Sequence, residues 1–146
     1  MHLPQGYTVT TNIKQMDVEL IHLYLSASSY WAQGIPLSTV QKSMQHSLCF
    51  AILYETCTVA FARIVSDYAT FAYLCDVFVL PAHRGKGLSK YLIQSIHEHT
   101  ALQGLRRWTL FTKDAHGLYQ QFGWKVMTPE EAQRCMNILH TNIYLH

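Results

Sequence analysis

The stretch from Asp76 to His99 constrains the fold most, because it joins an apolar run, a glycine-containing loop and a helical pattern. Apolar and β-branched residues from Tyr73 to Leu80 predict a buried strand, which Pro81 ends. The loop Arg84-Gly85-Lys86-Gly87 follows. From Leu88 onward, apolar residues recur at helical spacing and polar residues occupy the opposite face, which predicts an amphipathic helix.

This loop has the features of an anion-binding site. The first N–H groups of a helix have no intrahelical partners and carry partial positive charge, so they attract phosphate. Gly85 and Gly87 can adopt positive φ, while Arg84 and Lys86 add positive charge, so we expect a pyrophosphate here. The P-loop pattern GxxxxGK[ST] is absent, and the dinucleotide pattern GxGxxG fails because Lys90 replaces its third glycine.

Two segments resemble motifs of the GNAT superfamily of N-acetyltransferases. The first, Arg84-Gly85-Lys86-Gly87-Leu88-Ser89, resembles motif A, Q/R-x-x-G-x-G/A, with serine in place of the last Gly or Ala. The second, from Thr112 to Trp124, resembles the signature N-x-x-A-x-x-L-Y-x-x-x-G-F. It matches in register at Ala115, Leu118, Tyr119 and Gly123, whereas Thr112 replaces asparagine and Trp124 replaces phenylalanine.

The resemblance implies that acetyl-coenzyme A is the cosubstrate, with its pyrophosphate in the glycine loop and its pantetheine arm beside the preceding strand. The implied binding residues are Val77, Phe78, Val79, Arg84, Gly85, Lys86, Gly87, Leu88, Ser89, Thr112, Ala115 and Tyr119. It also implies that main-chain N–H groups near Val77 to Val79 stabilise the oxyanion. Tyr119 matches the family tyrosine near the thioester sulfur, so we expect it to protonate the leaving thiolate; the alternative is a core tyrosine.

Asp76 is the second expected catalytic residue. It is the only charged side chain between Tyr73 and Leu80, and a carboxylate in an apolar strand needs a partner. It can accept the proton of an attacking amine, hold the ammonium group, or fix a nearby loop. Strand alternation places it on the face of Leu74 and Phe78 unless a bulge changes that facing.

The acceptor site is expected between two regions of the chain. The resemblance implies that the loop carrying Tyr30 and Trp31 helps to form it, and aromatic faces can bind a cation. Arg63, Asp67 and Tyr68, on or beside the preceding strand, complete the expected substrate-binding residues. Trp31 has an alternative role as a hydrophobic cover over the core.

The predicted fold is a mixed α/β (α+β) domain with a mostly antiparallel central sheet of about six or seven strands, flanked by four helices, an order that resembles the GNAT fold. The expected strands span residues 7–11, 48–54, 58–65, 71–80, 108–112, 124–127 and 134–145. The expected helices begin at Asp17, Ser38, Leu88 and Asp114, where three polar side chains are candidate caps.

Composition narrows the classes of protein. The 146 residues fit one domain, 1–146, with 49% hydrophobic and only 14% charged residues. A net charge of +2 without a long basic run argues against nucleic-acid binding. We expect no membrane span and no secretory signal, and therefore a cytoplasmic protein. We expect it to be a monomer or a homodimer. Four scattered cysteines and poorly spaced histidines predict no metal site.

The function implied by the resemblance is direct transfer of an acetyl group from acetyl-coenzyme A to a primary amine of a small molecule. Two other readings stay open. One is acetylation of protein lysines or N-termini, and the other is a noncatalytic domain that binds or senses acyl-coenzyme A.

Overall fold

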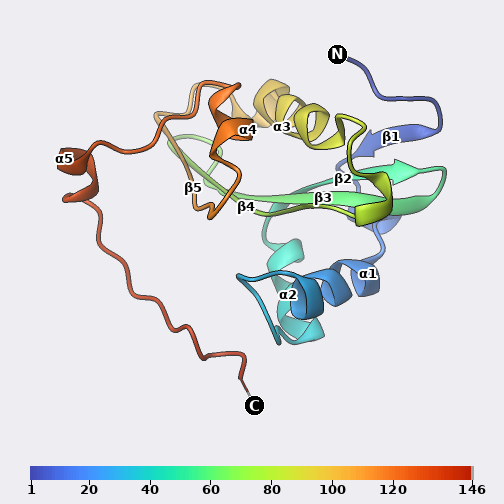
Figure 1. The fold of residues 1–146 in the computed structure, drawn as a ribbon, viewed down its shortest axis with the longest axis horizontal. Helices are drawn as coiled ribbons and strands as arrows, with labels where there is room; N and C mark the ends of the chain where they lie inside the picture. The colour runs from blue at the N-terminus through green and yellow to red at the C-terminus, as the bar shows by residue number, and fades with distance from the viewer. Residues whose placement is uncertain (146) are drawn as a thin grey trace.

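The computed structural model describes residues 1–145, which form five strands and five α-helices (Figure 1). The strands are β1 (Tyr7–Thr10), β2 (Leu48–Tyr54), β3 (Cys57–Ser66), β4 (Phe71–Val79) and β5 (Arg107–Leu110). The helices are α1 (Val18–Leu23), α2 (Leu37–Gln45), α3 (Leu88–Glu98), α4 (His116–Gln120) and α5 (Pro129–Ala132). A π-helical turn, Tyr24–Ser28, continues α1.

The strands form one sheet in the order β1-β2-β3-β4-β5. The first three neighbouring pairs are antiparallel, whereas β5 is parallel to β4. This parallel pair is joined through α3, as a parallel pair requires a crossover connection. The predicted mixed, mostly antiparallel sheet is therefore confirmed.

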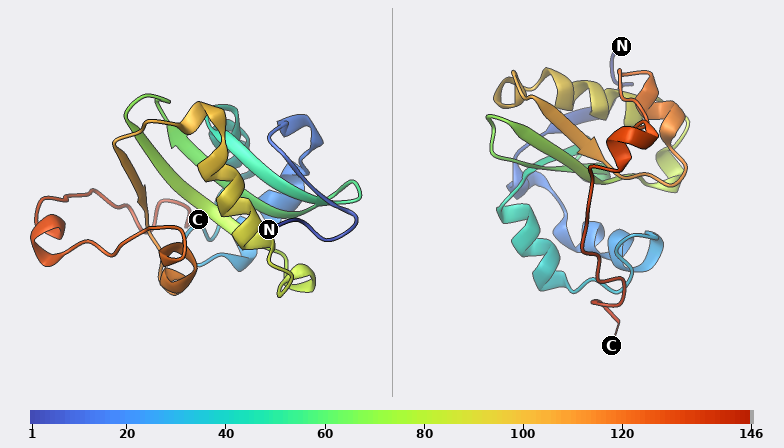
Figure 2. Two further views of the ribbon diagram at one scale, coloured as in Figure 1. Left: turned by 90° about the horizontal axis from the view of Figure 1, so that it is seen from above. Right: turned by 90° about the vertical axis from the view of Figure 1, so that its left-hand side faces the viewer.

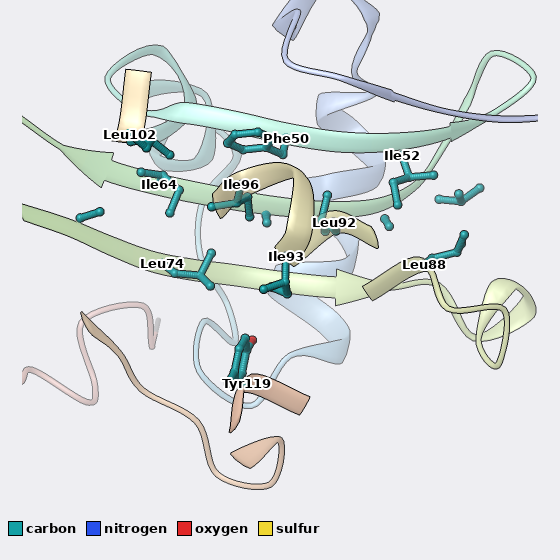
Figure 3. Close-up of a cluster of buried hydrophobic side chains, with 14 residues drawn as sticks. Phe50, Ile52, Ile64, Leu74, Leu88, Leu92, Ile93, Ile96, Leu102 and Tyr119 are labelled. Carbon is teal, nitrogen blue, oxygen red and sulfur yellow. The ribbon is translucent and has the colours of Figure 1, made fainter. Parts of the chain in front are cut away.

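Helices cover both faces of the sheet, with α1 and α2 on one face and α3 and α4 on the other (Figures 1 and 2). The apolar stripe of α3 packs on one face of the sheet, where Leu92, Ile93 and Ile96 are fully buried beside Phe50 (Figure 3). A second cluster fills the face under α1 and α2. None of the helices in residues 1–145 is long and apolar enough to cross a bilayer.

A bulge in β4 changes which face its residues occupy. Phe61 pairs with Phe78 and Arg63 pairs with Cys75, so two residues of β4 lie opposite one residue of β3. Asp76, at this bulge, has a positive φ of 56°. As a result Leu74 packs in the α3 cluster, whereas Phe78 packs in the cluster under α1 and α2, on the opposite face.

Several local predictions were wrong. Within residues 1–145, segments 124–127 and 134–145 form no strands, so the sheet has five strands rather than six or seven. Neither segment pairs with a neighbouring strand in the described part of the chain, and β-propensity alone does not form a strand. Asp17 caps α1 by accepting a hydrogen bond from the Leu20 N–H at 3.1 Å, as predicted. By contrast, α2 and α4 begin without side-chain caps, so Ser38 and Asp114 are not caps.

Candidate active site

The glycine loop lies between the short 3-10 turn Pro81–His83 and the start of α3. Gly85 and Gly87 have φ values of 78° and 77°, so both occupy the left-handed region that glycine favours. A Cβ atom at either position would meet no atom within 4 Å, so space is open in front of the loop. Among the described residues, no protein group accepts a hydrogen bond from the N–H groups of residues 85–90.

Arg84 is held in place beside this loop. Its Nε donates to the Val79 carbonyl oxygen at 3.0 Å, and its Nη2 donates to the Tyr24 hydroxyl at 3.1 Å. The Tyr24 ring stacks on Phe78, with ring centroids 4.0 Å apart. The π-helical turn that begins at Tyr24 therefore aims an aromatic side chain at the end of β4, and local π-turns often occur at functional sites.

β5 pairs only with the first part of β4. Their pairing ends at Leu74 and Leu110, while β4 continues to Val79 with β3 as its remaining partner. The main-chain groups of β4 beyond Leu74 thus have no β5 partner within the described chain. This divergence opens the sheet beside the expected oxyanion-binding residues Val77 to Val79.

Two cavities lie along this opening. The loop cavity, about 380 Å³, is lined by the turn at Tyr24 and Ser28, by Val77 to Val79 and by the glycine loop. The strand cavity, about 500 Å³, is lined by Tyr73 to Val77 of β4 and by Leu110 to Ala115. Both volumes are typical of ligand pockets. Both cavities share Tyr30, Trp31, Val77, Asp114, Ala115 and Tyr119 as lining residues.

Tyr119, on α4, lies where the two cavities meet. It is only 7% exposed, and Figure 3 shows it at the margin of the α3 cluster with its hydroxyl oxygen on the side of β4. Burial raises the pKa of Tyr119 to about 12, with smaller contributions from Tyr30 and Asp114. The phenol therefore keeps its proton near neutral pH. Within residues 1–145 its hydroxyl makes no hydrogen bond to the protein.

Asp76 has two partners at the strand cavity. Its Oδ2 accepts a hydrogen bond from Arg63 Nε at 2.9 Å, and its Oδ1 accepts one from Trp31 Nε1 at 2.9 Å. The side chain of Arg63 is 18% exposed and that of Asp76 is 10% exposed. Arg63 also donates to the Ser47 hydroxyl. The carboxylate thus fixes the loop that carries Trp31, and each oxygen keeps a free lone pair.

The loop between α1 and α2, which carries Tyr30 and Trp31, lies over the cavities rather than over the core. Trp31 is 41% exposed and belongs to neither core cluster, in contrast to its alternative role as a core cover. The Tyr30 hydroxyl accepts a hydrogen bond from the Lys113 N–H at 2.9 Å, and Lys113 Nζ lies 5.6 Å from the Tyr30 ring centroid. The loop between α1 and α2 is therefore tied to the segment that precedes α4.

Other expected site residues lie elsewhere. Asp67 accepts hydrogen bonds from the Thr70 hydroxyl and several N–H groups of the β3–β4 turn, and these bonds lower the pKa of Asp67. Neither Asp67 nor the exposed Tyr68 lines the two cavities. Lys86 also lies outside both. The Thr112 hydroxyl accepts a hydrogen bond from the Ala115 N–H, so this side chain positions the start of α4.

Sequence reasoning missed Tyr24, Ser28, Tyr73 and Phe111, which also line the cavities. They are scattered along the chain and follow no motif, and only the fold brings them together. Among the described residues, no three His, Cys, Asp or Glu side chains are grouped as metal ligands.

Comparisons with known proteins agree with this geometry. Residues 18–124 match the profile of the "Acetyltransferase (GNAT) family". A Gibberella zeae protein named "Putative acetyltransferase FG08082" is 30% identical over 135 residues, covering 77% of this chain and 75% of that protein.

Solved structures extend the comparison. A GNAT-family crystal structure from Xanthomonas campestris pv. campestris is 47% identical, with a TM-score of 0.93, covering 99% of this chain and 100% of that chain. A GNAT acetyltransferase from Elizabethkingia anophelis, solved with acetyl-CoA bound, is 10% identical with a TM-score of 0.63. The match covers 86% of this chain and 80% of that chain, and the two proteins share the fold. The chain therefore belongs to the acetyltransferase (GNAT) family, a family of acyltransferases.

Proposed function

We propose that this enzyme transfers the acetyl group of acetyl-coenzyme A to the primary amine of a small molecule, with Tyr119 as general acid. The observation that carries this proposal is the position of Tyr119, a protonated phenol where the two cavities meet. A thiolate that leaves the acyl carbon needs a proton, and a phenol without a protein hydrogen bond is available to supply it.

The loop cavity suits the diphosphate and pantetheine of the cosubstrate. Free N–H groups at the start of α3 suit phosphate oxygens, and Arg84 adds a positive charge at the same edge. Leu88 and Ser89 begin α3 within this cavity. Acetyl-coenzyme A supplies an activated acyl group when bound; the chain holds it, keeps water away and positions the Tyr119 proton.

The oxyanion that develops on the acyl carbonyl needs donors that are already in place. Val77, Phe78 and Val79 line the loop cavity on β4, beyond the point where β5 separates. We assign to the carbonyl oxygen those main-chain N–H groups of this stretch that point away from β3. The bulge at Asp76 supports this assignment, because a bulge leaves local main-chain groups outside the regular ladder.

The strand cavity is the proposed acceptor site. Its walls include the aromatic side chains of Tyr30, Trp31, Tyr73 and Phe111, which favour a cationic or apolar amine. Asp76 lies at the same cavity, and its free lone pairs can hold the acceptor's ammonium group or take its proton. A volume of about 500 Å³ favours a small molecule over a folded protein surface.

The experiment combines binding and turnover. Calorimetry with acetyl-coenzyme A, coenzyme A and ATP tests the loop cavity, and we expect both coenzyme A compounds to bind and ATP to bind weakly. Thiol release is then measured across amino acids, polyamines, aminoglycosides and peptides. Tight binding without thiol release for any amine would contradict the enzyme and favour a sensor, and preference for peptides would contradict the small acceptor.

A further inference from the structure

Asp114 lies at the junction of the two cavities and has a carboxylate that the fold does not use. It lines both the loop cavity and the strand cavity, as Tyr119 does. The side chain is exposed, and within residues 1–145 its oxygens take part in no hydrogen bond or ion pair. Ligand pockets fix their ligands with a small number of polar groups, and this carboxylate is available for that purpose.

The local structure before α4 explains why the carboxylate has no main-chain partner. An aspartate at this place was expected to cap the helix, yet α4 begins without a side-chain cap. The Thr112 hydroxyl instead accepts the hydrogen bond from the Ala115 N–H, at 3.0 Å. Thr112 therefore stabilises this turn, and the carboxylate of Asp114 stays at the cavities.

The other carboxylate of the strand cavity is already compensated. Asp76 Oδ2 lies 2.9 Å from Arg63 Nε, and its Oδ1 accepts a hydrogen bond from Trp31. Opposite charges at this distance cancel much of the field that an approaching ligand meets. Of the two carboxylates, Asp114 thus presents the stronger attraction for a cation.

One cation also borders the strand cavity. Lys113 is the only lysine or arginine among the lining residues described for it. Its Nζ lies 5.6 Å from the centroid of the Tyr30 ring, and within residues 1–145 it forms no ion pair with a carboxylate. Lys113 therefore faces an aromatic ring and does not neutralise Asp114 by direct contact.

Asp114 is also close to the proposed general acid. It is the charged side chain that contributes to the raised pKa of Tyr119, because a nearby negative charge disfavours the phenolate. The acceptor nitrogen must reach the acyl carbon beside Tyr119. A cation bound by Asp114 is therefore held near the atoms that react.

We infer that Asp114 binds the ammonium group of the acceptor, and that the acceptor is an aliphatic amine that is cationic at neutral pH. This role rests on the proposed acetyl transfer and specifies the acceptor for the same site. The aromatic walls at Tyr30 and Trp31 contact the rest of the acceptor. Asp114 acts in binding, and the ammonium gives one proton to water before its nitrogen attacks.

Steady-state thiol release with the best aliphatic amine of the panel tests this role. Asp114→Asn should raise KM for the amine at least about fivefold, because the neutral amide loses the charge attraction. Asp114→Glu keeps the charge and should keep KM within about threefold of wild type. The control Glu19→Gln, at an exposed carboxylate of α1 outside both cavities, should match wild type. A smaller rise for Asp114→Asn would overturn the inference.

Calorimetry on the coenzyme A complex separates binding from chemistry, because no acetyl group is present. Asp114→Asn should bind the same amine at least about fivefold more weakly than wild type. The difference should shrink between about 0.05 M and 0.5 M NaCl, because salt screens an exposed charge. Equal affinities, or a difference that salt leaves unchanged, would overturn the role of the charge.

Aniline, which is neutral at neutral pH, tests the acceptor class. A kcat/KM for aniline above that of every aliphatic amine would contradict the inference, whereas slower or absent turnover of aniline supports it. If wild type releases thiol with no amine, the proposed acetyl transfer itself fails. If aliphatic amines are acetylated and Asp114→Asn behaves as wild type, the binding role of Asp114 alone fails.

Discussion

Replacing Tyr119 with phenylalanine removes one hydroxyl and keeps the buried ring. Within the described chain this hydroxyl makes no hydrogen bond to protein, so its loss leaves no orphaned partner and should change the free energy of unfolding little. The ring keeps its edge-to-face contact with Trp124, at a centroid distance of 6.0 Å. Tyr119→Phe is therefore a clean test of the general-acid assignment.

The expected loss follows from the role of the proton. A positioned general acid contributes about 10²–10⁴-fold to a rate, which corresponds to about 2.7–5.4 kcal/mol of transition-state stabilisation. The loss should appear in kcat, because the substitution removes only the hydroxyl and leaves the glycine loop, the proposed diphosphate site, unchanged. Affinity for coenzyme A should change by less than about threefold.

The pH profile gives an independent check. The pKa of Tyr119 is raised to about 12, so the acid form is present below that pH and is lost only as pH rises through it. Wild type should therefore show no basic limb from this group below about pH 10. Any basic limb seen at lower pH belongs to another group and should persist in Tyr119→Phe.

The assay is thiol release with the best amine of the panel, together with calorimetry for coenzyme A. Tyr54→Phe is the matched control, because Tyr54 lies on β2 outside both cavities, and it should keep wild-type turnover. If Tyr119→Phe keeps kcat within about threefold of wild type, the hydroxyl is not the acid.

Three further predictions concern the loop, the ion pair and a histidine. Gly87→Ala should weaken coenzyme A binding and lower the free energy of unfolding by about 1–2 kcal/mol, because Gly87 has a φ of 77° that alanine disfavours. The control Gly117→Ala, in α4 with ordinary φ, should change neither quantity. If calorimetry and urea denaturation show the same effects for both variants, this reasoning is refuted. Asp76→Asn should destabilise the fold by about 2 kcal/mol in urea denaturation, because the guanidinium of Arg63 loses its charge partner. If acetyl transfer and its pH profile are unaltered, Asp76 has no catalytic role. Burial lowers the pKa of His97, so the unfolded chain binds the proton first; stability should fall below about pH 6.5, and His97→Gln should flatten that decline in urea titrations. An unchanged slope would contradict it.

Most of the site residues that could be predicted from the sequence belong to the two motifs. The glycine loop and the α4 segment are local sequences whose spacing sets their backbone conformation, so Gly85, Gly87 and Tyr119 were identifiable without coordinates. Asp76 was identifiable as a charge that needs a partner. Its partners were not, because Trp31 lies 45 residues and Arg63 13 residues away in sequence.

The bulge in β4 shows why strand alternation is an incomplete guide. Alternation placed Asp76, Leu74 and Phe78 on one face, but one extra residue opposite β3 moves Phe78 to the other face from Leu74. No local signal in the sequence marks a bulge at a non-glycine position with positive φ. The pairing of β4 with β3 decides it.

The sequence by itself determined the elements whose signals are local: strands with long apolar runs, the amphipathic α3, the glycine loop and the family to which they belong. Tertiary structure decided what depends on distant partners, namely where the pairing of β4 with β5 ends, the cavities that meet at Tyr119, and the lack of a partner strand for segments 124–127 and 134–145. The physical reason is that helix and turn preferences are satisfied within a few residues, whereas a strand or a pocket wall exists only when another segment supplies the opposite side.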